Sequence, residues 1–507
     1  MLNLKELVNI LDASKAQQIE VLENPYQADT LYAKFYKGIK AGIIKSDEDA
    51  IKYLYTENEF NIYKYNKLKN RFKNKLLNST FLIDSNQPSY SSGQRIYYSC
   101  HKNLALINIL LGKGAKQTAI DLGDRTLRKA IKFEFTDIVI SLIKILRNLY
   151  ALFKVDKKKF NTLNKLYHEH TFYLKAEAEA EELFCSLSIN LIGSKDYKKE
   201  YSGKAKEYSL RLNKYKESVE THNFLFFSAI IELIEHEIKN DYDKVIRICE
   251  KVYNKLLAKP FKLKVKIFPF VFKAFYGNLK LCKYLKVRNL INPCLETLDY
   301  GSINWFKFNQ MYFIYLMRTD QFMKANELLF EVNSNRSFSF QDTNTQEIWK
   351  IYEAYILLML DNKIITQKPK RAFRIGKFLN EVPVFSKDKR GLNVTIIIVQ
   401  ILMLLKQKKY NAIIDKMAGL ERYSSRYLTM FNTYRCNCFI KMLLQLEKRS
   451  FHPIAVKRHT EKYMEKLQKV PLEKSEAALE MEIIPYDTLW KMILKLLAKQ
   501  QKLEVFD

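Results

Sequence analysis

Apolar side chains recur three and four residues apart through most of this chain, and this spacing constrains its fold more than any other feature. The segments TAIDLGDRTLRKAIK, TDIVISLIKILRNLYALF and NFLFFSAIIELIEHEI show the pattern, which is typical of helices buried along one face. From about residue 95 to residue 450, such segments alternate with short turns and almost no strand pattern. Glycine (13 residues) and proline (10 residues) are scarce, whereas all-β proteins need many turn residues. The sequence therefore predicts an all-α protein.

Six turns share a form in which polar residues precede an aromatic or apolar residue and a new amphipathic helix. The aromatic or apolar positions are Tyr197, Tyr242, Tyr284, Phe322, Ile365 and Tyr410. Successive positions are 45, 42, 38, 43 and 45 residues apart. A step of about 40 residues accommodates a pair of helices of roughly 17 to 20 residues each. We therefore expect antiparallel helix pairs stacked in a repeat array.

Two of these segments, NDYDKVIRICEKV and TDQFMKANELLFEV, resemble the second helix of a tetratricopeptide repeat, with the small residue Ala325 before a further apolar contact. The full tetratricopeptide pattern of Trp, Leu-Gly, Tyr, Ala, Phe and Pro is not met in any unit. Residues 386–415, Arg426 to Leu428 and 482–490 resemble a large uncharacterised family of all-helical bacterial proteins of the same type. The resemblance implies a right-handed tetratricopeptide-like helical solenoid of antiparallel helix pairs with non-repeat helical ends. It implies no activity.

Breaks in the helical pattern predict three regions. The polar stretch from Asp84 to Gln94 contains Pro, Gly and four serines and separates an N-terminal helical region, 1–92, from a repeat region, 93–450. The pair His452 and Pro453 opens the last region, 451–507, and Pro485 suits the first turn of a final helix. We expect this last region to cap the array.

The cysteines and the apolar runs indicate a cytoplasmic protein. Seven cysteines are scattered without regular spacing, so a disulfide framework is not expected. The first fifteen residues lack the uninterrupted apolar core of a signal peptide. The longest apolar stretch, Val394 to Leu405, spans about 12 residues, short of the roughly 18 to 20 needed to cross a bilayer. We therefore expect no membrane span.

The chain carries 85 Lys and Arg against 55 Asp and Glu, a net charge of +30 that attracts anionic partners. Only 18 of the basic residues are Arg, which is the side chain that binds phosphate in a bidentate fork. The chain is also rich in Asn, Ile, Tyr and Phe, whose codons, like those of Lys, are A/T-rich. Two interpretations remain open: a solvated surface reflecting composition, or a functional basic face.

The most one-sided segment, Lys251 to Leu295, holds eleven basic residues and no acidic residue. Eight aromatic residues lie among them, a mixture that neutralises phosphates and offers rings for stacking, although the rings could equally belong to the core. Its segment KLKVKIF fits either a short strand or a helix buried on one side. The candidate partner-binding surface comprises Lys262, Lys264, Lys266, Lys273, Lys280, Lys283, Lys286 and Arg288.

Two further clusters are basic. The secondary candidate surface comprises Lys368, Lys370, Arg371, Arg374 and Lys377, expected on a turn and the helical positions after it. Six basic residues also lie between Lys64 and Lys75 with no acidic residue, on a helix expected to bury Tyr65, Leu68, Phe72 and Leu76. Either cluster is compatible with an anionic partner.

We find no pattern for catalysis, a metal or a cofactor. His168 and His170 lack the i,i+4 spacing of a helical metal pair, and Cys436 and Cys438 have no second pair. The segment GKGAKQTA does not follow the order of a phosphate-binding loop. We therefore expect a non-enzymatic interaction scaffold, without cofactor or small-molecule substrate, whose partner is another protein. The alternative is a nucleic-acid-binding or regulatory protein that uses its Lys-rich faces.

Overall fold

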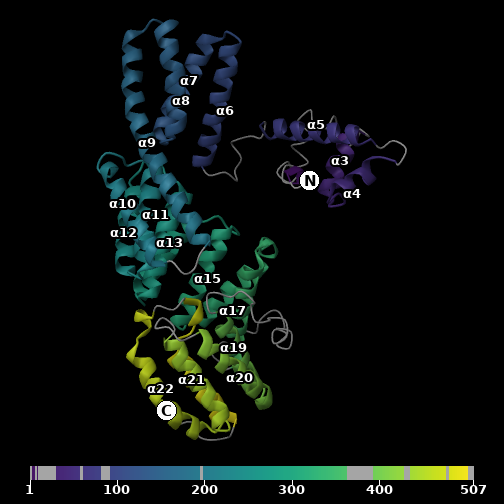
Figure 1. Ribbon diagram of the computed structural model, residues 1–507, viewed down its shortest axis with the longest axis vertical. Coiled ribbons are helices and arrows are strands. Elements are labelled where there is room, and N and C mark those ends of the chain that lie inside the picture. Colours follow the sequence, from purple (N-terminus) through teal and green to yellow (C-terminus); the bar gives the residue numbers. More distant parts are fainter. Residues whose placement is uncertain are drawn as a thin grey trace. The chain divides into compact units, whose positions relative to one another are not determined.

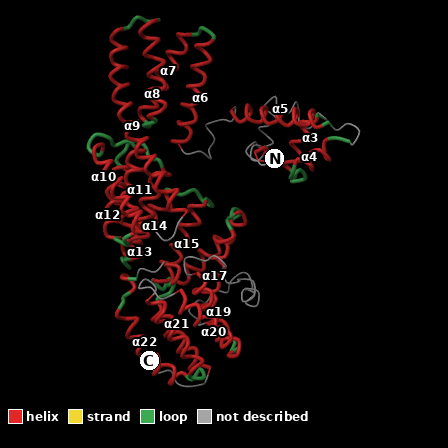
Figure 2. The backbone as a smooth tube through the Cα atoms, in the orientation of Figure 1, coloured by secondary structure: helices red, strands yellow, loops and turns green. Residues whose placement is uncertain are grey.

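The computed structural model describes residues 3–5, 8, 30–56, 61–81, 92–193, 198–361, 392–427, 434–475 and 479–500. Within these ranges the chain forms helices and turns and no strand, so the prediction of an all-α protein is confirmed there (Figure 2). The chain divides into two compact units, Met1–Phe160 and Asn161–Asp507. The expected boundary at residues 92 and 93 falls inside the first unit.

The first unit contains two groups of helices (Figure 1). The bounds of the first group are α3 Leu31–Lys40, α4 Asp47–Leu54 and α5 Ile62–Phe81. The bounds of the second group are α6 Ser92–Gly112, α7 Lys116–Lys132 and α8 Thr136–Leu152. As expected, α5 buries Tyr65, Leu68, Phe72 and Leu76, which pack in a core with α3 and α4.

Helices α7 and α8 approach each other closely at Gly123. A Cβ atom placed on Gly123 would lie 2.8 Å from Cδ2 of Leu146, a fully buried side chain of α8. Since real Cβ contacts are essentially never this short, the absence of a side chain at Gly123 sets the separation of the two helices.

The second unit opens with α9, Lys157–Gly193, which begins in the last residues of the first unit. The bounds of the helices that follow are α10 Lys198–Leu212, α11 His222–Ile238, α12 Tyr242–Leu257, α13 Lys264–Lys280, α14 Tyr284–Glu296, α15 Ile303–Arg318, α16 Phe322–Ser334 and α17 Thr343–Asp361. The bounds of the last helices are α19 Leu392–Lys406, α20 Tyr410–Tyr427, α21 Tyr434–Lys448, α22 Pro453–Lys469 and α23 Tyr486–Gln500. Helices adjacent in sequence pack as neighbouring pairs.

The same tight turn closes several of these pairs. In the second unit, Asn240, Cys282, Asp320 and Lys408 adopt positive φ angles of 53–56°, each two residues after the last residue of a helix. The N–H of the following residue then donates to the carbonyl five residues earlier, at 2.9 or 3.0 Å. This is the Schellman geometry, in which a left-handed residue ends a helix and satisfies its last carbonyls. The next helix starts one residue later.

Four of the six predicted anchor positions are the first residues of helices after these turns. They are Tyr242 of α12, Tyr284 of α14, Phe322 of α16 and Tyr410 of α20. The prediction of helix pairs joined by short turns is thus confirmed here. Tyr197 and Ile365 lie outside the described residues.

The last region shares its core with the helices before it. Tyr486, Leu489 and Trp490 of α23 are buried in the same cluster as side chains from α13 to α22. Pro453 is the first residue of α22, and Pro485 directly precedes α23, as their positions predicted. Helices α22 and α23 therefore extend the core of the second unit.

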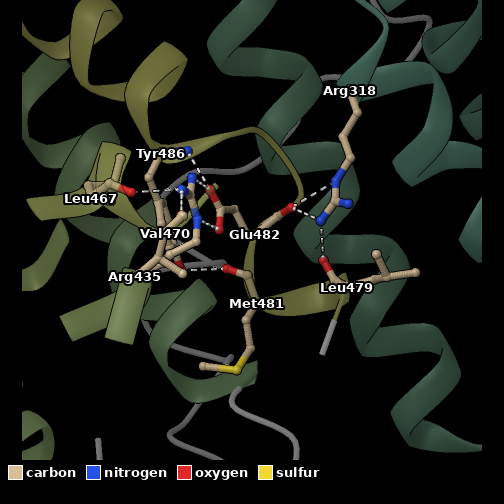
Figure 3. Close-up of polar contacts among 8 residues, drawn as sticks. All are labelled: Arg318, Arg435, Leu467, Val470, Leu479, Met481, Glu482 and Tyr486. Atoms are coloured by element: carbon tan, nitrogen blue, oxygen red, sulfur yellow. Dashed lines mark hydrogen bonds and ion pairs between the residues drawn. The ribbon is translucent and has the colours of Figure 1, made fainter. Parts of the chain in front are cut away.

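Two buried arginines hold the segment before α23 in place (Figure 3). Arg435 of α21 donates to both carboxylate oxygens of Glu482, at 3.0 and 2.6 Å, and to the carbonyls of Leu467 and Val470. Arg318, at the end of α15, donates to the backbone carbonyl of Glu482 at 2.6 Å. The Glu482 carboxylate also accepts the N–H of Tyr486. One acidic residue thus connects three helices.

No helix in the described ranges is both long and apolar enough to cross a bilayer.

Candidate functional site

Four of the eight residues of the candidate partner-binding surface make contacts within the protein. Lys273 is paired with Glu237 of α11, and Lys283 lies 2.7 Å from the carboxylate of Asp243 of α12. Both acids precede the basic segment in the sequence, on α11 and in the first turn of α12. Their carboxylates balance part of a charge excess that appears unopposed in the sequence.

Lys266 and Lys280 lie against aromatic rings. The ammonium of Lys266 contacts the amide oxygen of Asn223 and lies 5.2 Å from the ring of Phe226. Burial lowers the pKa of Lys266, because it disfavours the charged form. Lys280 is buried, with its ammonium 6.0 Å from the ring of Tyr242. Both side chains contribute to packing between helices.

The aromatic residues of this segment belong to the core. Phe268, Phe270 and Phe275 of α13 are buried among side chains of neighbouring helices. The segment KLKVKIF joins α13 rather than a strand, since α13 begins at Lys264. Rings enclosed in this way are not available to stack on a base.

The other four predicted residues are exposed but do not form one surface. Lys262 and Lys264 lie at the start of α13, whereas Lys286 and Arg288 lie in the first turns of α14. Because α14 runs back along α13 after a short turn, the two pairs are separated by nearly the length of α13, about 24 Å at 1.5 Å per residue. The secondary surface from Lys368 to Lys377 lies outside the described residues.

Some basic residues of α5 contact other side chains of the protein, and others are exposed to solvent. Lys69 lies 2.7 Å from the carboxylate of Asp47, and Lys75 lies over the ring of Tyr32 at 4.7 Å. Lys64, Lys67 and Arg71 are exposed along one face of the helix. This face carries three cations.

A denser basic face lies on α7, and sequence reasoning missed it. Arg125, Arg128, Lys129 and Lys132 are exposed and follow the spacing i, i+3, i+4 and i+7, which places them on one stripe of the helix. Buried Ala119, Gly123 and Ala130 occupy the opposite stripe and hold α7 against its neighbours. The spacing is visible in the sequence DRTLRKAIK, but the nearby acids Asp121 and Asp124 keep the segment from standing out as a charge run.

The four cations line a hollow between α6 and α7 of about 380 Å³, which we call the α7 groove. Asn103 of α6 and Thr126 of α7 also line it, and the Asn103 amide donates to the Thr126 hydroxyl at 3.1 Å. Arg125 donates through Nε to the backbone carbonyl of Asp121. Arg128, Lys129 and Lys132 make no side-chain hydrogen bond or ion pair with another described residue. The α7 groove is therefore a concentrated and largely uncompensated positive site.

The described residues include no group of three or more His, Cys, Asp or Glu that could hold a metal ion. Cys436 and Cys438 are buried in the core, and burial raises the pKa of the Cys436 thiol to about 12. The Gly112 to Ala119 segment contains the turn from α6 to α7, with Gly114 at φ +80°, and the first residues of α7.

No protein-family model matches the chain, and neither a curated protein nor a solved structure shows significant similarity to it.

Proposed function

We propose that the helix pairs of the second unit form a right-handed solenoid of the tetratricopeptide type, as the resemblance of the sequence suggests. Support comes from α11 to α16, which form three successive pairs. In each pair, a left-handed residue occupies the same position in the turn after the first helix. The fully buried Ala325 in α16 suits the close helix packing of such repeats. A repeat array presents an extended surface along its length, and this surface is where such proteins bind.

On this fold we propose a macromolecular interaction scaffold that binds another protein and catalyses no reaction. One observation carries the proposal. The start of α13, the end of α14 and the start of α15 lie at the same end of their antiparallel array, and each exposes a large apolar side chain. Val265 is 75% exposed, Leu295 40% and Ile303 65%. Apolar side chains gathered at one place are typical of protein-binding surfaces.

The neighbouring charges indicate the character of the partner. Lys262 and Lys264 are exposed beside Val265 at the start of α13. A partner surface that is apolar at its centre and acidic at its rim would complement this end of the array. We call Val265, Leu295 and Ile303 the apolar end.

Affinity capture from nuclease-treated extracts of the native cell tests the proposal. We expect a protein partner to be retained by the wild type and lost by the double variant Val265→Ser and Ile303→Ser. The matched control is Leu152→Ser with Ile109→Ser, which removes two exposed apolar side chains, 85% and 60% exposed, from the first unit. Equal capture by all three proteins would contradict a role of the apolar end.

We also propose a cytoplasmic location with no cofactor or small-molecule substrate. The seven cysteines support it, because none of them forms a disulfide bond and five are buried thiols. Burial raises the pKa of Cys249 to about 12, which makes this thiol unreactive.

Nucleic-acid binding is a second candidate function, favoured by the four exposed cations on one face of α7. Binding of this kind weakens steeply with salt because it releases counterions from the phosphates. Binding to a mixed-sequence oligonucleotide is therefore expected at about 50 mM salt and should fall sharply by about 200 mM. An absence of binding at the lower salt would refute this function.

A further inference from the structure

We propose that the α7 groove binds the phosphate backbone of a nucleic acid through the cations of α7. This inference rests on the second candidate function and assigns it to one site in the first unit. It involves neither the basic segment from Lys251 to Leu295 nor the apolar end.

The cations of α7 are as concentrated as the charges of a nucleic acid. Arg125 and Lys132 are seven residues apart, which corresponds to about 10.5 Å along the helix axis. Four cations over this length give on average one positive charge in roughly 3.5 Å. This linear charge density is similar to that of one strand of a duplex, which carries one negative charge per roughly 3.4 Å of the duplex axis. An acidic peptide would match this density only with consecutive Asp or Glu residues, since an extended chain advances about 3.3–3.6 Å per residue.

The chemistry of the lining also suits phosphate. Two of the four cations are Arg, whose planar fork can donate two parallel hydrogen bonds to a phosphate. The side-chain amide of Asn103 has two N–H donors, and Thr126 accepts only one of them. Arg128, Lys129 and Lys132 are not committed to carboxylates of the described chain, so binding breaks no ion pair at these residues.

The surrounding charges leave the groove positive. Residues 92–137, which include the turn after α7, contain eight Lys and Arg against three Asp and one Glu, a net charge of +4. Asp124 accepts a hydrogen bond from the Tyr150 hydroxyl of α8 at 2.6 Å, and Asp121 accepts one from Gln117 at 3.0 Å. Asp121 lies one turn before Arg125, where it places a negative charge at one end of the groove.

Fluorescence anisotropy with the full chain and a labelled oligonucleotide of 20 nucleotides tests the site. The groove variant replaces Arg125, Arg128, Lys129 and Lys132 with Gln. The matched control replaces Lys262, Lys264, Lys286 and Arg288 with Gln, which are also exposed, so that both variants carry a net charge of +26, that is, +30 less four. A third variant, Asp121→Asn, removes the acidic charge beside Arg125.

We expect the groove variant to lose roughly a hundredfold or more in affinity at about 50 mM salt, and its plot of log K against log salt to become shallower by about 3. The control should change affinity by less than about threefold. Asp121→Asn should bind about two- to fivefold more tightly, a gain that misfolding cannot produce. Circular dichroism of each variant verifies that its helices are retained.

Several results would overturn the inference. Equal losses in the groove variant and the control would mean that the overall charge attracts the oligonucleotide, which keeps the second candidate function but removes the site. Unchanged affinity of Asp121→Asn would also contradict the groove. Displacement of the oligonucleotide by poly-glutamate at a lower charge concentration than by unlabelled oligonucleotide would assign the groove to an acidic protein. No binding by the wild type would refute the function and the site together.

Discussion

Replacing Arg435 by Met should strongly destabilise the second unit. The side chains of Arg435 and Glu482 are 6% and 4% exposed, so the pair is shielded from water. Without the guanidinium, the Glu482 carboxylate retains one hydrogen bond from a described residue, the N–H of Tyr486 at 2.8 Å. The carbonyls of Leu467 and Val470 lose the donor that Arg435 provides.

The burial of the Arg435–Glu482 pair determines how much free energy of unfolding each variant should lose. Removing one partner of a buried ion pair leaves an uncompensated charge and costs about 3–5 kcal/mol of the free energy of unfolding. Glu482→Leu should cost a similar amount, because it leaves the guanidinium buried with only backbone carbonyls. The double variant Arg435→Met with Glu482→Leu removes both charges and should cost less than either single change. The coupling energy between the two residues then exceeds about 3 kcal/mol.

Urea unfolding followed by tryptophan fluorescence measures these free energies in the second unit alone. All three tryptophans of the chain, Trp305, Trp349 and Trp490, lie in that unit and are buried. Unfolding of the first unit therefore does not contribute directly to the signal. Losses that simply add in the double variant would refute the reasoning, since the two charges would then not depend on each other.

Three further results are expected. Gly123→Ala should lower the melting temperature despite the higher helix propensity of Ala, because the new methyl group overlaps buried Leu146. Its control, Gly203→Ala in α10, should raise the melting temperature, because the space around Gly203 is open. Lys408→Gly should stabilise the second unit by about 1 kcal/mol in the same urea assay, since Lys408 has a φ of +56° that glycine adopts without strain. Exposed Cys185 should react rapidly with a thiol reagent at pH 8, while Cys249, whose pKa burial raises to about 12, should react only after unfolding. Because Cys282 is half-buried, a fast phase that persists in the double variant Cys185→Ser with Cys282→Ser would contradict this.

Local features of the sequence predicted the helices and several of their ends. The spacing of apolar residues requires no knowledge of distant contacts, so α5 and its buried face could be predicted. The polar turns before Tyr242, Tyr284 and Phe322 marked the starts of helices for the same reason. The left-handed residues in the turns between helices could not be predicted as easily. Cys282, before Tyr284, and Lys408, before Tyr410, occupy positions where glycine is usual.

Ion pairs between helices could not be predicted from a short stretch of sequence, because the two partners belong to different helices. Lys283 and Asp243 are 40 residues apart, and only the packing of α14 near α12 brings them together. The segment from Lys251 to Leu295 contains no acidic residue, yet its partners Glu237 and Asp243 lie just before it in the chain. The face of α7 shows the converse. Its four cations were predictable from helical spacing, but a count of net charge along the sequence hides them among acids.

The turns that close the helix pairs also define where the chain could be shortened or lengthened during evolution. Asn240 and Cys282 occupy equivalent positions, each two residues before a helix that begins with tyrosine. Deleting residues 242–283 would join Asp241 to Tyr284 and recreate a turn of the same length, with Asn240 as its left-handed residue. Loss or duplication of this 42-residue stretch therefore requires no new turn sequence. Each turn thus carries within itself the means to end one helix and begin the next.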